Sequence, residues 1–548
     1  MSAPQSFDAI DLSIMWDRLI SITDEGAAAL VRTSFSTLVR EGFDLSVLIF
    51  DLRGRIIAQS AKCIPVFIGT ASTTLRHMLD KIPPESLEAG DVVVSNDPVF
   101  GTGHMYDIAV MRPIYLKGDL VGYAMSISHL PDIGGMGFSA SATEIYHEGL
   151  RLPVVKLVKA GVVNQDFMNL IRLNVRVPDQ VIGDIHANIS CTSVVTRQVV
   201  DFMETYGCSS LEPLANAILQ QSEDALRQAL LAWPDGQHTG EVLVEAGEET
   251  RRLVCTVKKL GDRLSIDFTG TEGCVRFGSN VPICYTRSMA LYAAKCLTTP
   301  MIPNNEGSSA LIEVSAPVGC ILNAVPPAPS AGRHAIGHFV VPLVFDTVSK
   351  ILPDQVAADS GLIDFLTLQG HLPDGSGMSV TYCAAGGFGA LQGLDGRQTT
   401  PGSSNMGTTP IEVFESLSGL RVEEKILRPD SGGVGQYRGG VGQVVSMRNM
   451  TGQDVTVHAM SNRTRFPAKG LFGGGNGAPR AHLIDGRETS GQGSFRLPPN
   501  SVLTLKQAGG GGYGSPKDRP RDAVRQDIED GFLTIEQARE TYEYDGAA

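Results

Sequence analysis

Histidines and carboxylates are concentrated in one window of the chain, between residues 96 and 148. His104-Met-Tyr-Asp107 places an imidazole three residues before a carboxylate, and His129-Leu-Pro-Asp132 repeats that spacing about 25 residues later. Imidazole and carboxylate groups are ligands that Zn, Mn and Fe take in proteins. Three such ligands leave an open position at which a divalent ion activates water or polarises a carbonyl. The repeated spacing therefore indicates a metal site.

Each fragment taken alone also has a structural explanation, in which the histidine hydrogen-bonds to loop carbonyls. His371-Leu-Pro-Asp374 has the same spacing and lies far from any such cluster. Two copies within one window, beside the glycine-rich stretch 131–141, favour the metal site over this alternative.

Other motifs have weaker support. His334 and His338 are four residues apart on an expected helix, but Ala335 stands where H-E-x-x-H zinc sites carry glutamate, so a core or surface role is expected. Pro429–Gly433 resembles a protease nucleophile loop, but no paired cysteines or suitable histidine segment accompany it. The dipeptide Gly-Lys is absent, which excludes a G-x-x-x-x-G-K-[ST] nucleotide loop. Gly509–Gly514 offers backbone N–H groups to an anion, although a structural turn explains it at least as well.

Hydrophobic spacing predicts the elements that position these residues. Apolar residues at intervals of three and four predict a helix over 10–40, interrupted near Gly26, and further helices over most of 163–232, at 287–297 and at 335–350. Strands are predicted at 45–57, around 91–111, at 121–127, through 240–269 and over most of 375–507. The glycine-rich stretch 131–141 is expected to be a loop, and 522–541 a helical tail in two parts.

The predicted class is α+β with several domains, in which a helical and metal-bearing N-terminal half precedes a β-rich, glycine-rich C-terminal half. A length of 548 residues suits three or four domains. We expect an N-terminal α+β domain with the metal site over residues 1–235 and a β-meander with helices over 236–350. A glycine-rich and mainly β domain is expected over 351–520, followed by a helical tail over 521–548.

Composition narrows the class of protein further. With 45 Lys and Arg against 59 Asp and Glu, the net charge of −14 argues against a nucleic-acid partner. No apolar run approaches the ~20 residues of a membrane span, and no secretory signal is recognised. Nine scattered cysteines without a C-x-x-C pair are typical of reduced thiols. The expectation is a cytoplasmic protein with no membrane association.

Many short motifs in one order resemble the hydantoinase B family, which includes N-methylhydantoinase B subunits, the second half of 5-oxoprolinases, caprolactamase small subunits, and subunits of acetone and acetophenone carboxylases. The resemblance extends nearly from end to end. It rests on Glu41–Ser46, Asn96–Pro98, Gly103–Asp107, His129–Gly135, Glu148–Pro153, Asp267–Thr271, Ile302–Gly307, Pro327–Pro329, Asn405–Glu415, Asp430–Gly433, Tyr437–Gly440, Gly470–Gly474 and the cluster that begins at Gly509.

The resemblance implies a division of labour with a larger, hydantoinase A-like subunit that binds ATP and phosphorylates an amide or enol oxygen of the substrate. ATP would then be bound by that partner, which agrees with the missing nucleotide loop. It implies that His104, Asp107 and His129 hold the metal, and that Asp44 or Asp132 is the general base or orients the site. His147 departs from the family pattern, and it is a possible proton carrier.

These implications predict the B subunit of an ATP-dependent cyclic amidase, acting on a hydantoin, oxoproline or lactam ring within a hetero-oligomer. The alternative is a subunit of an ATP-dependent ketone carboxylase. A third possibility is a non-catalytic scaffold for the ATP-using subunit, which would have no need to hold imidazoles beside carboxylates.

Overall fold

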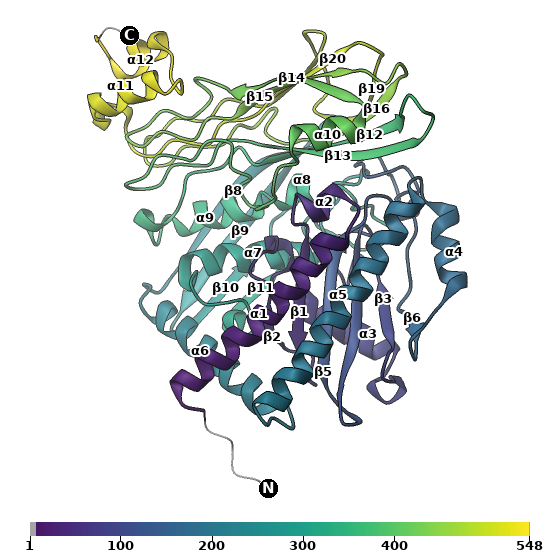
Figure 1. Ribbon diagram of the computed structural model, residues 1–548. Coiled ribbons are helices and arrows are strands. Elements are labelled where there is room, and N and C mark those ends of the chain that lie inside the picture. Colours follow the sequence, from purple (N-terminus) through teal and green to yellow (C-terminus); the bar gives the residue numbers. More distant parts are fainter. Residues whose placement is uncertain (1–6, 547–548) are drawn as a thin grey trace.

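The computed structural model describes residues 7–546, in which helices and four β-sheets follow one another along the chain (Figure 1). The mixed class with several sheets is confirmed. The helices are α1 (Ala9–Thr33), α2 (Thr37–Arg40), α3 (Ala71–Lys81), α4 (Gln165–Asn174), α5 (Pro178–Thr205), α6 (Glu212–Leu231), α7 (Ile283–Thr298), α8 (His334–Gly337), α9 (Val340–Val348), α10 (Ile411–Ser418), α11 (Arg521–Glu529) and α12 (Ile535–Tyr542).

The N-terminal sheet has seven antiparallel strands in the order β2-β1-β5-β4-β3-β6-β7. Alternate residues of β1 face opposite cores: Val47 and Ile49 contact the side of α1 and α5, whereas Leu48 and Phe50 contact the opposite side. Because both faces are covered, β1 is buried throughout and apolar except for Ser46. The strands are β1 (Leu45–Phe50), β2 (Ile56–Gln59), β3 (Val92–Ser95), β4 (Asp107–Leu116), β5 (Asp119–His129), β6 (Val155–Lys159) and β7 (Val162–Val163).

Helix α1 continues through Gly26, where the sequence predicted an interruption. A Cβ at this position would lie 2.5 Å from Cγ2 of Val195 on α5, so glycine is required for the two helices to approach. The chain breaks later instead, where Asp184 Oδ1 accepts the backbone N–H of Phe35 at 2.6 Å and Ser36 caps α2. Close helix packing, not local breaking, explains this glycine.

The second sheet has the order β11-β10-β9-β8, and α7 and α9 pack against it. One core contains Val110 of the first sheet, Val257 of the second and Phe365 of the C-terminal part. Side chains on both sides of residues 235 and 350 therefore share a core, and the domain boundaries placed there remain predictions. The strands are β8 (Gly236–Ala246), β9 (Glu249–Leu260), β10 (Arg263–Asp267) and β11 (Ile312–Ser315).

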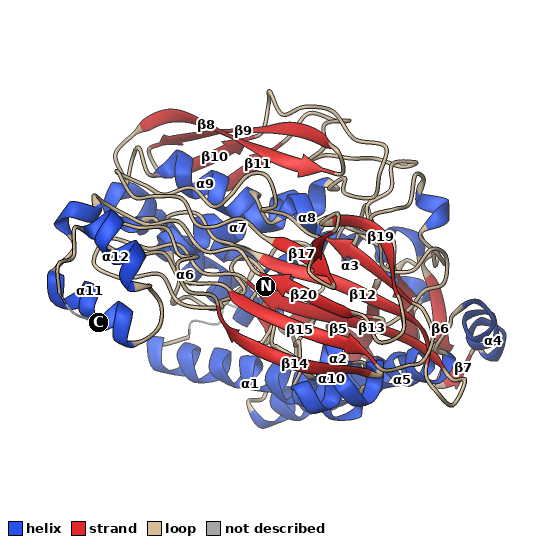
Figure 2. Cartoon of the chain, turned by 90° about the horizontal axis from the view of Figure 1, so that it is seen from above, coloured by secondary structure: helices blue, strands red, loops and turns tan. Residues whose placement is uncertain are grey.

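Two further sheets lie at the top of the molecule in Figure 1 and face the viewer in Figure 2. Their orders are β13-β12-β16-β19 and β14-β15-β20-β17-β18, and they enclose an apolar core to which Leu368, Val457, Met447 and Leu505 contribute. The strands are β12 (Ile363–His371), β13 (Gly377–Ala385), β14 (Leu420–Leu427), β15 (Gln443–Asn449), β16 (Val455–Met460), β17 (Ala481–Ile484), β18 (Arg487–Glu488), β19 (Gln492–Leu497) and β20 (Val502–Lys506).

Glycine-rich segments below these sheets pack backbone against backbone and run side by side toward α11 and α12 (Figure 1). Gly510 donates its N–H to the carbonyl of Gly440 at 3.0 Å, and Gly512 donates to that of Gly475 at 2.9 Å. The N–H groups of Gly509 and Gly511 are bonded to backbone carbonyls in the same way. Because neighbouring segments take up these donors, the run beginning at Gly509 is structural and not an anion cradle.

The tail predicted to be helical in two parts forms α11 and α12. Arg519 ties it to the glycine-rich segments, because its guanidinium donates to Asp395 on one side and to Asp527 on the other. Within residues 7–546, no helix is both long and apolar enough to cross a membrane.

Candidate metal centre

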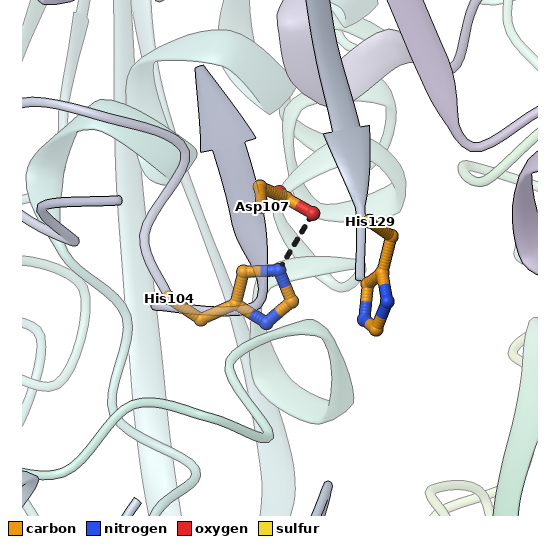
Figure 3. Close-up of side chains that lie close together, drawn as sticks. All are labelled: His104, Asp107 and His129. Atoms are coloured by element: carbon orange, nitrogen blue, oxygen red, sulfur yellow. Dashed lines mark ion pairs between the residues drawn. The ribbon is translucent and has the colours of Figure 1, made fainter. Parts of the chain in front are cut away.

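Two adjacent strand ends bring the predicted metal ligands together (Figure 3). Asp107 is the first residue of β4 and His129 the last of β5, and the antiparallel register pairs them directly. His104 lies on the turn before β4, after Gly103, whose φ of 95° favours glycine. The hairpin β4–β5 therefore fixes the spacing of the two histidine fragments in space.

One ligand atom from each of these residues lies within 4.8 Å of the others, and all three side chains are buried. His104 Nε2 and Asp107 Oδ1 are 2.9 Å apart, yet neither has a well-aligned hydrogen bond within the described part of the chain. Both ring nitrogens of His129 also lack a partner among residues 7–546. Buried polar atoms without partners are rare in proteins, and a shared divalent ion would satisfy all of them. The donor set thus fits a metal.

Neighbouring groups hold these side chains in place. Asp107 Oδ2 accepts hydrogen bonds from Thr102 Oγ1 and from Arg333 Nη2, the latter at 3.0 Å. Arg333 also donates Nε–H to the Thr102 carbonyl at 2.7 Å, and its guanidinium lies 4.6 Å from the ring centre of Tyr285. Such contacts orient metal ligands and fix their basicity.

The electrostatic environment keeps the three ligands in the forms that bind metals. Burial lowers the pKa of His129 to about 3, with His104 acting in the same direction. Burial and then Arg333 lower the pKa of His104. Burial alone would raise the pKa of Asp107, but His104, Arg333 and His129 together hold it well below its ordinary value. Two neutral imidazoles therefore face one carboxylate at neutral pH.

Asp44 belongs to the same site. It precedes β1, its side chain is buried in the lining of the cavity that holds His104 and His129, and its backbone carbonyl accepts the N–H of His129 at 3.2 Å. Its Oδ1 has no hydrogen-bond partner among the described residues. Burial, with the nearby charge of Asp107, raises its pKa well above the ordinary value.

Asp132 and His147 are not brought into this cavity. Asp132 is buried in an ion pair of 2.8 Å with Arg176, and its Oδ1 also accepts the N–H of Gly134, because the glycine-rich loop after β5 turns away from the centre. His147 is exposed, with Nδ1 3.2 Å from the hydroxyl of Thr143. Their expected roles as base and proton carrier find no support in these positions.

Three cavity residues come from a distant segment that the sequence did not single out as part of this site. Arg333, His334 and His338 lie on or beside α8, and all three line the cavity. The prediction of a core or surface role for His334 and His338 allowed for their burial but missed the cavity that they share with His104 and His129. Their four-residue spacing was the available signal, and only the fold places α8 opposite the β4–β5 hairpin.

Glu148 supports the centre from the side of the ligand His104. Its Oε1 accepts the backbone N–H groups of Ser330 at 2.5 Å and Ala331 at 2.7 Å, and the Ala331 carbonyl lies 3.4 Å from His104 Nδ1. Burial raises the pKa of Glu148 to about 7. Glu148 therefore holds the segment that orients the imidazole of His104.

Glu148→Ala is expected to weaken metal binding about 10–100-fold, because the segment that orients His104 loses its anchor. Glu148→Gln keeps a carbonyl acceptor and is expected to retain affinity within a few-fold. Competition with a chromophoric chelator measures both. Equal affinity in the alanine variant and the parent would show that the anchor has no effect on the metal.

The glutamine variant also tests the raised pKa of Glu148. The carboxyl has a pKa of about 4.5 when unfolded and about 7 when folded, so the folded chain binds more protons between these values and loses stability as the pH rises. Glu148→Gln lacks this loss, so its melting temperature relative to the parent is expected to be higher at pH 8 than at pH 5. Melting curves at the two pH values measure the difference, and a constant difference would contradict it.

Comparison with known proteins places this geometry in a family. Residues 8–516 match the model of the Hydantoinase B/oxoprolinase family. An uncharacterised protein of Methanocaldococcus jannaschii is 30% identical over 98% of this chain and 96% of its own length. The B subunit of a putative D-/L-hydantoinase from Pseudomonas sp. strain NS671 is 26% identical over 98% of this chain and 95% of its own. The 5-oxoprolinase 1 of Arabidopsis thaliana is 27% identical over 93% of this chain, which covers 42% of that protein.

Two solved structures have the same fold. The ATP-dependent caprolactamase from Pseudomonas jessenii superposes with a TM-score of 0.90 and 25% identity, over 98% of this chain and 96% of that chain. An acetone carboxylase in its nucleotide-free form gives a TM-score of 0.88 at 18% identity, over 97% and 79% of the two chains, which shows the shared fold. The family match spans nearly the whole chain and agrees with the motifs around the centre, so this protein belongs to the Hydantoinase B/oxoprolinase family.

Proposed function

We propose that this chain is the B subunit of an ATP-dependent cyclic amide hydrolase, which opens a hydantoin, oxoproline or lactam ring. The observation that carries the proposal is the buried group of His104, Asp107 and His129, whose ligand atoms lack partners within residues 7–546 and lie within 4.8 Å of one another, with both histidines lining one cavity. The names of the relatives, which include the B subunit of a hydantoinase and the beta subunit of a caprolactamase, support the substrate class.

His104, Asp107 and His129 would hold a divalent ion, for which Zn, Mn and Fe are the candidates. Such an ion supplies Lewis acidity toward a carbonyl or phosphoryl oxygen and activates water. Arg333 holds Asp107 in position through its 3.0 Å hydrogen bond. Asp44 is buried and lines the cavity, and in this proposal its carboxylate would take a proton from the attacking water.

ATP would be used by a separate hydantoinase A-like subunit. An unactivated amide is a poor electrophile, and phosphorylation of its oxygen provides a leaving group. Two relatives that match over 95% and 96% of their own length are named as B and beta subunits. The 5-oxoprolinase of Arabidopsis thaliana is a longer protein, and more than half of its length lies outside the matched region. These names and lengths support a hetero-oligomer in which the partner activates the substrate and this chain completes its hydrolysis.

The second candidate is ATP-dependent carboxylation of a ketone, because the acetone carboxylase shares the fold. The same ligands would then polarise an enol oxygen or a carboxyl donor. A scaffold without catalysis is disfavoured, because buried imidazoles and carboxylates without partners reduce stability unless they bind something.

Co-purification with the A-like subunit and assay with ATP test the two reactions. We expect ring opening of hydantoin, 5-oxoproline or ε-caprolactam that does not depend on bicarbonate, with one oxygen of the product derived from labelled water. Incorporation of ¹³C-bicarbonate into a ketone, with no ring opening, would replace the hydrolase with the carboxylase. Absence of both reactions in a complex loaded with metal would contradict the proposal.

A further inference from the structure

A second pair of imidazoles lines the wall of the cavity formed by α8. His334 and His338 are 4% and 3% exposed, and their ring centres lie 5.9 Å apart. Phe138 stands between them and the metal ligands, with its ring 5.7 Å from His334 and 4.9 Å from His129. The two pairs of imidazoles therefore share one cavity but do not touch.

The pair has polar atoms that the protein leaves free. His334 Nε2 and His338 Nδ1 have no hydrogen-bond partner within the described residues 7–546. What the protein provides instead is apolar packing, since the His334 ring lies 4.4 Å from Phe365 and the His338 ring 6.4 Å from it. An aliphatic or aromatic side chain would serve such packing better, because a buried nitrogen without a partner costs stability. These contacts give no structural reason for histidine.

A second metal ion does not explain the pair. Among residues 7–546, His104, Asp107 and His129 form the one group of histidine, cysteine or acidic side chains whose ligand atoms converge closely enough for an ion. Two nitrogens alone make a poor site for a divalent cation. The ligand of His334 and His338 is therefore a polar group that hydrogen-bonds to imidazole.

The surroundings indicate an uncharged group. Burial, with the positive charge of Arg333 nearby, lowers the pKa of both imidazoles, so both are neutral. A neutral imidazole donates at one nitrogen and accepts at the other, which matches a group that carries both a donor and an acceptor. A phosphoryl group carries acceptors and negative charge, and Arg333 suits it better. Apolar side chains complete the wall and suit ring methylenes: Leu38, Ile64, Val66, Met289 and Met406.

We propose that His334 and His338 bind the amide group of the cyclic substrate before its oxygen is phosphorylated, one accepting from its N–H and the other donating to its oxygen, and so direct the amide carbon toward the proposed metal ligands. The proposal rests on the proposed function, since it names the part of the cyclic amide that this wall recognises. The proposal implies that the wall formed by α8 makes the site selective for amides over other carbonyl substrates.

The loop of Ser403, Ser404 and Met406 closes another side of the cavity. The cavity measures about 30 Å³, which is enough for a water molecule but not for a ring. The backbone N–H groups of Ser404 and Asn405 donate hydrogen bonds to the Pro401 carbonyl of the same loop. The N–H of Gly407 donates to the Gly42 carbonyl outside the loop. Binding of a ring therefore requires a wall of the cavity, such as this loop, to move.

The test compares His334→Leu, His334→Gln, His338→Leu and His338→Gln with the parent, using the full chain loaded with metal. ε-Caprolactam and inorganic phosphate are the probes, and ligand-observed NMR titration at millimolar concentrations measures binding. We expect each leucine variant to bind ε-caprolactam about tenfold more weakly, which corresponds to one lost hydrogen bond, and phosphate as the parent does. Metal content and melting temperature are expected not to fall, because the replaced nitrogens have no partner in the protein.

The glutamine variants, which offer a donor and an acceptor, are expected to recover part of the affinity. His371→Gln is the control for the loss of one histidine, because His371 is exposed at the end of β12 and does not line the cavity. Unchanged caprolactam binding in both leucine variants, or a lowered melting temperature without loss of binding, would overturn the proposal. So would a parent that binds no ε-caprolactam although the complex hydrolyses it.

The two proposals fail differently. Loss of amide binding in the variants, together with a complex that opens no ring, would retain the subsite and reject the hydrolase. Ring opening with unchanged binding and unchanged KM in the variants would retain the hydrolase and reject the subsite.

Discussion

Replacement of His104 or His129 by alanine is expected to abolish metal binding and to lower turnover of the reconstituted complex about 10³-fold or more. The magnitude follows from the several kcal/mol that a metal ion contributes to a hydrolytic transition state. Asp107 is better replaced by asparagine, because alanine would leave the buried guanidinium of Arg333 without its 3.0 Å partner. The apo forms of the histidine variants are expected to melt near the parent, because the ligand nitrogen atoms make no well-aligned hydrogen bond within the described chain.

Metal content after dialysis against Zn, Mn or Fe is the direct measurement. A second measurement is the rise in melting temperature on adding metal, which the parent shows and the variants lack, because an ion that binds only the folded chain stabilises it. His371→Ala is the control for histidine content, since this residue lies outside the cavity. Full metal content with full turnover in the His129 variant would reject the site.

Gly509→Ala is expected to destabilise the fold by about 3 kcal/mol, at the upper end of overpacking effects. A Cβ there would overlap the carbonyl oxygen of Ser431, and that atom belongs to a backbone segment that neighbouring glycine segments hold in place. A flexible side chain could move aside, but the backbone cannot do so without breaking several hydrogen bonds. The melting temperature is expected to fall by about 3 °C, because the unfolding entropy of a chain of 548 residues is about 1 kcal/mol/K.

Gly273→Ala is the matched control, because a Cβ there meets no described atom closer than the Gly319 carbonyl oxygen at 3.9 Å and the backbone suits any residue. Its stability is expected to remain within about 1 kcal/mol of the parent, since alanine reduces the freedom of the unfolded chain. Denaturant melts of both variants measure the contrast. A Gly509 variant as stable as the Gly273 variant would show that the glycine segments tolerate side chains.

The sequence was sufficient for features that depend on neighbours along the chain. The repeated His-x-x-Asp spacing predicted a metal site, and the family resemblance selected His104, Asp107 and His129. These residues lie in or just before one hairpin, whose register follows from its strands and turn. The helices between 163 and 232 and the two-part tail were predictable from apolar spacing for the same reason. Gly26 was misinterpreted because a glycine that permits close packing looks, in one dimension, like a glycine that ends a helix.

Proximity in sequence did not ensure proximity in space. Asp132 follows His129 by three residues, but the glycine-rich loop turns its carboxylate toward Arg176. His334 and His338 lie some 200 residues from the hairpin and share a cavity with it. No local sequence pattern indicates that these residues share a cavity, because their proximity depends on how sheets and helices from distant parts of the chain pack together.

The sequence by itself therefore determined the family and indicated the proposed metal ligands, since both depend on residue type and short-range spacing. Tertiary structure alone decided which side chains face the metal ligands across the cavity. Burial there leaves one nitrogen each of His334 and His338 without a partner among the described residues, and this unsatisfied hydrogen bonding, which depends on how distant segments pack, is the basis of the proposed amide subsite.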